Sequence, residues 1–288
     1  MLSRRSVLAA VLVLAGCSRK PAGKAPEAPG ASGPMTLPGA VAGRWRSPGD
    51  KVRDRWRHPA ESLAFWGLKP GWTVVEFWPG AGWYTDILAP YLASNHGRLY
   101  LANLQTADPA DLSAQEMDAA LRERIRARPG LYGDVRFTTF GPASGPVAPA
   151  GTADLVLFLR NLHNWMAAGV AEKAFRDAFD ALKPGGVLGI EEHRAAPGGV
   201  QDPLAGDGYV QQAYAIQLAK EAGFVLDKAS EINANPKDSR DHPFGVWTLP
   251  PVRRSSPRGQ PDDPTFDHAR YDAIGESDRM TLRFVKPR

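Results

Sequence analysis

The sequence predicts an α/β protein with a doubly wound, mostly parallel sheet of seven strands and helices on both faces. Apolar runs of strand length alternate along the chain with stretches of helical periodicity, which is typical of this class. The strand predicted at residues 154–159 is almost entirely apolar, as expected of a central strand covered on both faces. The run at residues 73–75 leads into a glycine-containing loop and a helix, an arrangement that binds ligands in such folds.

The first 17 residues have the features of an export signal. Arg4 and Arg5 precede an apolar run at residues 7–15, which is too short to span a bilayer as a helix. The run ends in Leu-Ala-Gly-Cys, which resembles the lipobox of bacterial lipoproteins. This resemblance implies cleavage before Cys17, lipid attachment to it, and a location on the periplasmic side of a bacterial membrane. Residues 3–8 also resemble a twin-arginine signal, so the sequence leaves the export route open.

Residues 18–43 are rich in Pro, Ala, Gly and Lys and contain no aromatic residue, which predicts a disordered tether. The domain is therefore expected at residues 44–288. The formal net charge is +4, and loss of Arg4 and Arg5 with the signal leaves +2. This small charge, without a basic patch that contains aromatic residues, gives no indication of nucleic-acid binding.

The domain begins with a stretch of charged and aromatic residues at 44–67, where we expect two short helices. Residues 60–66 are predicted to lie over the glycine loop as a lid. The first strand follows at residues 73–75 and ends at Glu76, and the helix after the loop is expected at residues 84–93.

The remaining elements follow in alternation. Strands are predicted at residues 98–104, 135–140, 154–159, 187–191, 224–232 and 280–285, and helices at residues 111–128, 169–182 and 209–223. Residues 233–279 are long for a loop and rich in Pro and Asp. Within them, residues 244–249 are apolar enough to pack, so we expect a partly ordered insertion.

Two histidines follow strands of the predicted sheet. His163 comes after the strand at 154–159, and His193 follows the strand at 187–191. Because the carboxyl ends of parallel strands meet at one edge, both are candidate general bases, with Glu192 as a possible orienting group. Each histidine can instead be a purely structural residue. A metal site from these three residues is conceivable, but no tight ligand spacing supports it, so we assign no metal.

The order of elements, together with two motifs, resembles the class I S-adenosylmethionine-dependent methyltransferases. Residues 76–82 lie where that family has an acidic residue and a Gly-x-Gly-x-Gly loop, and residues 181–188 match its later Leu-Lys-Pro-Gly-Gly motif. The chain is most similar to a group of predicted bacterial methyltransferases. The matching stretches are residues 77–85, 160–165, 192–197 and 274–280. The resemblance implies a Rossmann-like fold and S-adenosylmethionine as cofactor.

The resemblance also implies which residues bind the cofactor: Glu76, Trp78, Gly80, Ala81, Gly82, Tyr84, Asn103, Arg160 and Asn161. Glu76 and Asn103 would hold its amino-acid and ribose parts, and Asn103 stands where the family usually has an acid. Trp78 replaces the first glycine of the loop. Its ring and that of Tyr84 either offer π faces to the sulfonium or pack in the core. Arg160 and Asn161 either contact the cofactor or cap the following helix.

Two functions remain open for this sequence. The first is a membrane-anchored methyltransferase acting on a small-molecule acceptor. The second is a non-catalytic binding lipoprotein of the cell envelope that retains the methyltransferase fold. The second reading stays open because the methyl donor is made in the cytosol, whereas the signal at residues 1–17 directs this chain out of it.

Overall fold

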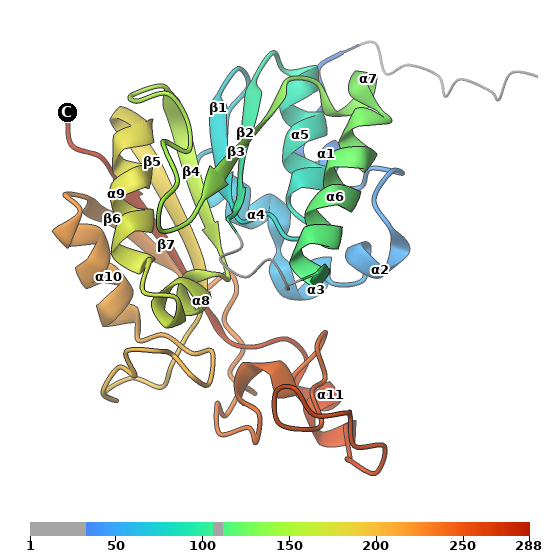
Figure 1. Ribbon diagram of the computed structural model, residues 1–288. Helices are drawn as coiled ribbons and strands as arrows, with labels where there is room; N and C mark the ends of the chain where they lie inside the picture. Colours follow the sequence, from blue (N-terminus) through green and yellow to red (C-terminus); the bar gives the residue numbers. More distant parts are fainter. Residues whose placement is uncertain (1–32, 106–111) are drawn as a thin grey trace, which may run out of the picture. The chain divides into compact units, whose positions relative to one another are not determined.

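A seven-stranded sheet organises the computed structural model, which describes residues 33–105 and 112–288 (Figure 1). The strands are β1 (Thr73–Phe77), β2 (Arg98–Leu104), β3 (Val135–Phe140), β4 (Ala153–Leu159), β5 (Leu182–His193), β6 (Val225–Ser230) and β7 (Arg279–Val285). Their spatial order is β3-β2-β1-β4-β5-β7-β6, in which β1 to β5 pair in parallel and β7 runs antiparallel to β5 and β6. The predicted doubly wound, mostly parallel sheet of seven strands is confirmed.

The direction of the strand order reverses between β1 and β4. From β1 the chain moves outward to β2 and β3, and it then returns to place β4 on the other side of β1. Phe77 at the end of β1 pairs with both Ala102 and Phe158, so the carboxyl ends of β1, β2 and β4 lie at one edge. Open α/β sheets bind ligands in the crevice at such a switch point.

Helices cover both faces of the sheet (Figure 1). They are α1 (Leu37–Val41), α2 (Pro48–Lys51), α3 (Asp54–Arg57), α4 (Pro59–Phe65), α5 (Thr85–Ser94), α6 (Leu112–Arg126), α7 (Pro129–Tyr132), α8 (Leu162–Ala167), α9 (Ala171–Ala181), α10 (Gln212–Glu221) and α11 (Ala269–Ile274), with a 3₁₀ turn η1 (Gly245–Thr248). On one face Phe158 packs edge-on against Trp165 of α8 and Phe175 of α9. On the other face Ile87 of α5 and Leu121 of α6 are buried.

The predicted tether at residues 18–43 is wrong at its C-terminal end. The Thr36 hydroxyl accepts a hydrogen bond from the Gly39 amide and caps α1, and Ala40 is fully buried. The side-chain amide of Asn95 also donates to the Met35 carbonyl at 2.9 Å. The Pro- and Gly-rich composition gave no indication of this helix, whose Leu37 and Val41 pack against the same apolar cluster as α5. Cys17 and the rest of the tether up to residue 32 lie outside the described residues.

The two short helices and the lid predicted before the first strand are also corrected. Three helices, α2 to α4, occupy residues 48–65. Residues 60–66 do not form a lid, because Leu63 and Trp66 are fully buried against the sheet. The Trp66 indole donates to the Leu282 carbonyl at 3.0 Å, and a Cβ on Gly189 would lie 2.7 Å from its ring. Gly189 therefore makes room for α4 to pack on β5.

The fifth strand is longer than predicted. It begins at Leu182, which pairs with Ala153, and a register shift precedes the regular pairing of Leu155 with Val187. The Lys-Pro-Gly-Gly segment does end α9, as predicted, but it forms an irregular start of β5.

The insertion at residues 233–279 is partly ordered, as expected. Val246 and Leu249 of its apolar stretch are buried around η1. Asn235 fixes the base of the insertion, because its side chain donates to the carbonyls of Ile274 and Glu276. Figure 1 shows the insertion extending beyond the sheet at the end where α3 and α8 lie. None of the helices in residues 33–105 and 112–288 has the length and apolar composition needed to cross a bilayer.

Candidate active site

A cavity of about 580 Å³ opens at the switch point between β1 and β4. Five parts of the chain line it: the loop after β1, the segment from β4 into α8, the end of β5, the helices before β1, and the insertion with the segment before β7. Side chains of α5 and α6 complete its wall. This volume lies within the range of about 300–1,000 Å³ that is usual for small-molecule sites.

The structure brings most of the predicted site residues to this cavity. Those that line it are Trp78, Gly80, Ala81, Arg160, Asn161, His163 and His193. Those that lie close by without lining it are Glu76, Gly82, Tyr84, Asn103 and Glu192.

Trp78 lines the cavity without closing it, and its backbone takes the left-handed conformation with φ +47°. Its amide donates to the Ala102 carbonyl at 2.8 Å, and its carbonyl accepts from the side-chain amide of Asn161 at 3.0 Å. The loop is thereby tied to β2 and to the end of β4. A non-glycine residue in this conformation costs about 1–3 kcal/mol, a strain that clusters at functional sites.

The two glycines of the loop have different roles. A Cβ on Gly82 would lie 2.6 Å from Leu121, so this glycine is required for α6 to pack against the loop. Arg124 of α6 donates to the Ala81 carbonyl at 2.7 Å. At Gly80, by contrast, the closest atom to an added Cβ is the Met117 sulfur at 3.6 Å, an ordinary van der Waals contact, and Gly80 itself lines the cavity. A ligand can therefore approach the main chain at Gly80.

Asn103 at the end of β2 has a buried polar atom without a partner. Its side chain is 6% exposed, and its amide oxygen accepts no hydrogen bond from the residues that the structure describes. An unsatisfied buried acceptor costs about 1–3 kcal/mol, which a hydroxyl group of a ligand would recover. The resemblance assigns ribose binding to this position, so the observed chemistry fits a nucleoside.

Glu76 and Tyr84 are buried and do not line the cavity. The Thr85 hydroxyl donates to Glu76 at 2.7 Å, and burial raises the pKa of Glu76 from 4.5 to about 7. The Tyr84 hydroxyl donates to Glu191 at 3.1 Å. The neighbouring ring of Trp83, a further candidate π face, packs against the guanidinium groups of Arg46 and Arg57, which lie 5.0 and 4.9 Å from its centroid.

His163 and Glu192 form a buried hydrogen-bonded pair. His163 Nδ1 lies 2.9 Å from Glu192 Oε1, and the carboxylate also accepts from the backbone amides of Leu162 and His193. Because a carboxylate is the acceptor, Nδ1 carries the proton and the neutral ring has its lone pair on Nε2. A carboxylate that holds an imidazole in this way is the arrangement of a general base. Glu192, rather than Asn161 or Arg160, satisfies the first amide of α8.

His193 is the second histidine at this edge, and its ring centroid lies 5.2 Å from that of His163. Its Nδ1 contacts the Ser277 hydroxyl at 2.5 Å. Burial, reinforced by the neighbouring His163 ring and by the positive charges of Arg279 and Arg160, holds the pKa of His193 well below its ordinary value. His193 is therefore neutral near pH 7.

The potential ligand atoms of His163, Glu192 and His193 lie within 4.8 Å of one another, so the fold supplies the proximity that sequence spacing did not indicate. Neutral imidazoles and a carboxylate are suitable metal ligands. However, the Glu192 carboxylate already accepts three hydrogen bonds, one of them from His163 itself, so it is occupied in orienting that ring. We therefore interpret this cluster as an oriented base.

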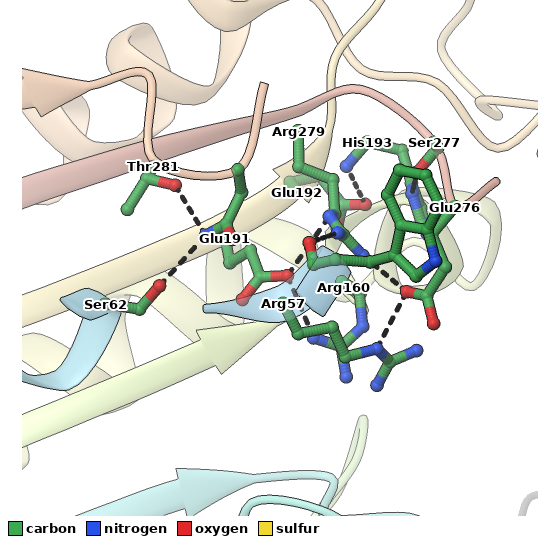
Figure 2. Close-up of polar contacts among 12 residues, drawn as sticks. Arg57, Ser62, Arg160, Glu191, Glu192, His193, Glu276, Ser277, Arg279 and Thr281 are labelled. Carbon is green, nitrogen blue, oxygen red and sulfur yellow. Dashed lines mark hydrogen bonds and ion pairs between the residues drawn. The ribbon is translucent and has the colours of Figure 1, made fainter. Parts of the chain in front are cut away.

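A buried network of ion pairs lies beside the histidines (Figure 2). Glu191 is fully buried and lies 3.0 Å from Arg160 and 3.3 Å from Arg279. Glu276, just before β7, lies 2.7 Å from Arg279 and 2.8 Å from both Arg53 and Arg57. Sequence reasoning missed Arg53 and Arg57, because arginines on short helices are ordinarily solvated. Glu276 lies in a stretch already noted for its resemblance, but without an assigned role.

Solved structures of low sequence identity share this fold. One is an S-adenosylmethionine-dependent methyltransferase from Aquifex aeolicus, which is 19% identical, with a TM-score of 0.50 over 68% of this chain and 93% of that chain. Another is the [4+2]-cyclase SpnF, which is 17% identical, with a TM-score of 0.53 over 87% of this chain and 91% of that chain. No protein-family model and no curated protein sequence matches the chain.

These similarities define the class of fold to which the chain belongs. It has the class I fold of the S-adenosylmethionine-dependent methyltransferases, with the cavity at the position where doubly wound folds bind their ligands. The cyclase shows that this fold also supports another reaction, so the reaction must be argued from the residues of the site.

Proposed function

We propose that this protein is an S-adenosylmethionine-dependent methyltransferase that acts on a small-molecule acceptor. The main support is the cavity at the switch point, which Gly80 lines after β1. Asn103, whose buried amide oxygen has no partner among the described residues, stands at the end of the neighbouring strand β2. The hydrogen-bonded pair of His163 and Glu192 lies on the β4–β5 side. One side thus suits a nucleoside, and the other suits proton transfer from an acceptor.

Gly80, Ala81, Trp78 and Asn103 would hold the cofactor, and Glu76 lies beneath them. When bound, S-adenosylmethionine supplies a methyl group on a positively charged sulfur. The protein's part is then to align the acceptor and to exclude water. Trp247 from the insertion lies 5.8 Å from the His163 ring and closes the cavity on that side.

His163 would remove the proton from the acceptor's attacking atom. Its Nε2 carries the lone pair, and Glu192 stabilises the imidazolium ion that forms when Nε2 accepts the proton. Because His193 is held neutral, it does not repel this developing charge. The two neighbouring histidines therefore have different roles, in which His163 is the base and His193 lines the cavity.

The first test is cofactor binding by a protein of residues 18–288. We expect S-adenosylmethionine to bind in titration calorimetry, and Asn103→Leu to raise its Kd about tenfold through loss of one hydrogen bond. The same substitution removes an unsatisfied buried acceptor, so the free energy of unfolding in urea should not fall. An unchanged Kd with intact folding would exclude Asn103 from the site, and no binding to the parent protein would refute the proposed function.

The second test is transfer of a radiolabelled methyl group to small molecules extracted from the cell envelope. We expect His163→Gln to lower the rate about 10²- to 10⁴-fold while the Kd for the cofactor stays the same. The control is His96→Asn, which changes an exposed histidine with φ +59° to a residue that tolerates this conformation. Cofactor binding without transfer to any extracted molecule would favour the non-catalytic binding lipoprotein.

We further propose that lipid on Cys17 anchors the protein to the periplasmic side of a bacterial membrane. The support is the Leu-Ala-Gly-Cys stretch after a basic and then apolar N-terminus. Metabolic labelling with radioactive palmitate should mark the protein but not its Cys17→Ser variant. Equal labelling of the two would show that the lipid is attached elsewhere.

A further inference from the structure

Three arginines from distant parts of the chain line the cavity beside the histidines. Arg53 and Arg57 come from the helices before β1, and Arg160 follows β4. We propose that Arg53, Arg57 and Arg160 form a subsite for a carboxylate or phosphate group of the methyl acceptor. This inference rests on the proposed function and adds the chemical class of the acceptor.

Each arginine keeps part of its guanidinium group free. Arg57 and Arg53 each use Nε to donate to Glu276 at 2.8 Å, and Arg160 uses Nη1 to donate to Glu191 at 3.0 Å. Both terminal nitrogens of Arg57 lack a hydrogen-bond partner in the described part of the chain, although the side chain is only 7% exposed. A guanidinium carries five N–H donors in a planar fork that matches a carboxylate or a phosphate.

The charges around the subsite do not balance. With Arg279, four guanidinium groups share the two carboxylates of Glu191 and Glu276, so these ion pairs alone contain more positive than negative charge. Buried charges without partners are costly, so an anion in this cavity would be stabilised.

Two other carboxylates line the cavity, but both are engaged elsewhere. The Ser47 hydroxyl donates to Asp50 at 2.7 Å. Asp86 lies 3.4 Å from Arg124 and accepts from the Tyr132 hydroxyl at 2.8 Å. Neither carboxylate pairs with the three arginines, but the charge of Asp50, which a hydroxyl does not neutralise, and the Glu192 carboxylate beside His163 offset part of the positive excess. The free guanidinium nitrogens of Arg57 therefore carry the argument for an anionic ligand.

The position of the arginines favours the acceptor over the cofactor. Their partners are Glu191 in β5 and Glu276 just before β7, on the side of the cavity where His163 also lies. Gly80 and Asn103, which suit the nucleoside, lie at the ends of β1 and β2. An anionic group held by Arg57 would therefore place the acceptor beside the proposed base. Figure 2 shows Arg57 in contact with Glu276 and Arg160 in contact with Glu191.

The experiment is a titration of the protein of residues 18–288 with benzoate, and separately with inorganic phosphate, at constant ionic strength and without cofactor. We expect at least one of these anions to bind, and Arg57→Gln to raise its Kd about 10- to 100-fold, as for loss of charge-assisted hydrogen bonds. Arg128→Gln, which changes an exposed arginine outside the cavity, should leave the Kd unchanged.

Arg53→Gln serves as a second variant. The Arg53 side chain is 23% exposed, more than that of Arg57, so we expect its replacement to disturb folding less. It should also weaken anion binding. If neither anion binds the parent protein, or if both arginine variants, once shown to be folded, bind as it does, the subsite does not exist. Because this titration omits the cofactor, anion binding without S-adenosylmethionine binding would support the subsite and refute only the proposed methyl transfer.

A second arm separates the acceptor's anionic group from the carboxylate of the cofactor itself. If the subsite belongs to the acceptor, S-adenosylmethionine and its decarboxylated analogue should bind the parent protein with similar Kd values. The anion should also still bind when cofactor is present. A much weaker binding of the decarboxylated analogue, together with loss of this difference in Arg57→Gln, would assign the arginines to the cofactor and overturn the proposal.

Discussion

Replacing Glu191 by Gln should lower the free energy of unfolding by about 3–5 kcal/mol. The carboxylate is fully buried and contacts Arg160, Arg279 and the Tyr84 hydroxyl at 3.0, 3.3 and 3.1 Å. The amide has nearly the same shape, so the loss comes from the charge. Arg160 loses its carboxylate partner, and Arg279, which is only 1% exposed, keeps Glu276 as its remaining counter-ion. Urea denaturation at pH 7 measures the effect.

The matched control is Glu172→Gln, in an ion pair on the surface of α9. Glu172 lies 3.4 Å from Arg176, and the two side chains are 72% and 61% exposed. Solvent screens such a pair, so its loss should cost less than about 1 kcal/mol. If Glu191→Gln and Glu172→Gln lowered the free energy of unfolding equally, the ion pairs around Glu191 would not form an interdependent buried cluster.

Replacing Glu76 by Gln should change how stability depends on pH. Burial raises the pKa of Glu76 from 4.5 to about 7, so the folded state binds this proton more tightly than the unfolded state does. Protonated Glu76 therefore contributes fully to the stability of the folded state below pH 4.5, and this contribution is lost as the pH rises through about 7. The shift corresponds to about 3 kcal/mol. At pH 8 the Gln variant should exceed the parent protein in stability by up to this amount, and the difference should shrink toward pH 5.

Urea denaturation of both proteins at pH 5 and pH 8 checks this expectation. The control is Glu116→Gln, an exposed acid on α6, which should leave the pH dependence unchanged. If the free energy of unfolding changed equally between pH 5 and pH 8 in the parent protein and in Glu76→Gln, Glu76 would ionise normally in the folded state. If Glu76 also holds the amino group of the cofactor, the more stable variant will bind S-adenosylmethionine more weakly, as expected of a strained functional residue.

The parts of the site that could be predicted are those that follow strands. His163 comes four residues after the end of β4, and His193 is the last residue of β5. Because the ends of parallel strands meet at one edge, their proximity followed from the fold class. The orientation of side chains did not follow. Glu76 and Tyr84 were assigned to the cofactor, but both side chains are buried and neither lines the cavity. Residue spacing places a backbone at an edge, whereas packing of the next helix decides which way a side chain points.

The sequence by itself determined the sheet, the glycine loop and the carboxyl edge that carries the histidines, because apolar periodicity and turn residues are local properties of the chain. Only the tertiary structure decided the charge of the cavity. Arg53 and Arg57 reach Glu276 across 223 and 219 residues of chain, and the insertion turns back to close the cavity above His163. Such pairings carry no local pattern, because they depend on which surfaces the complete fold brings together and shields from water.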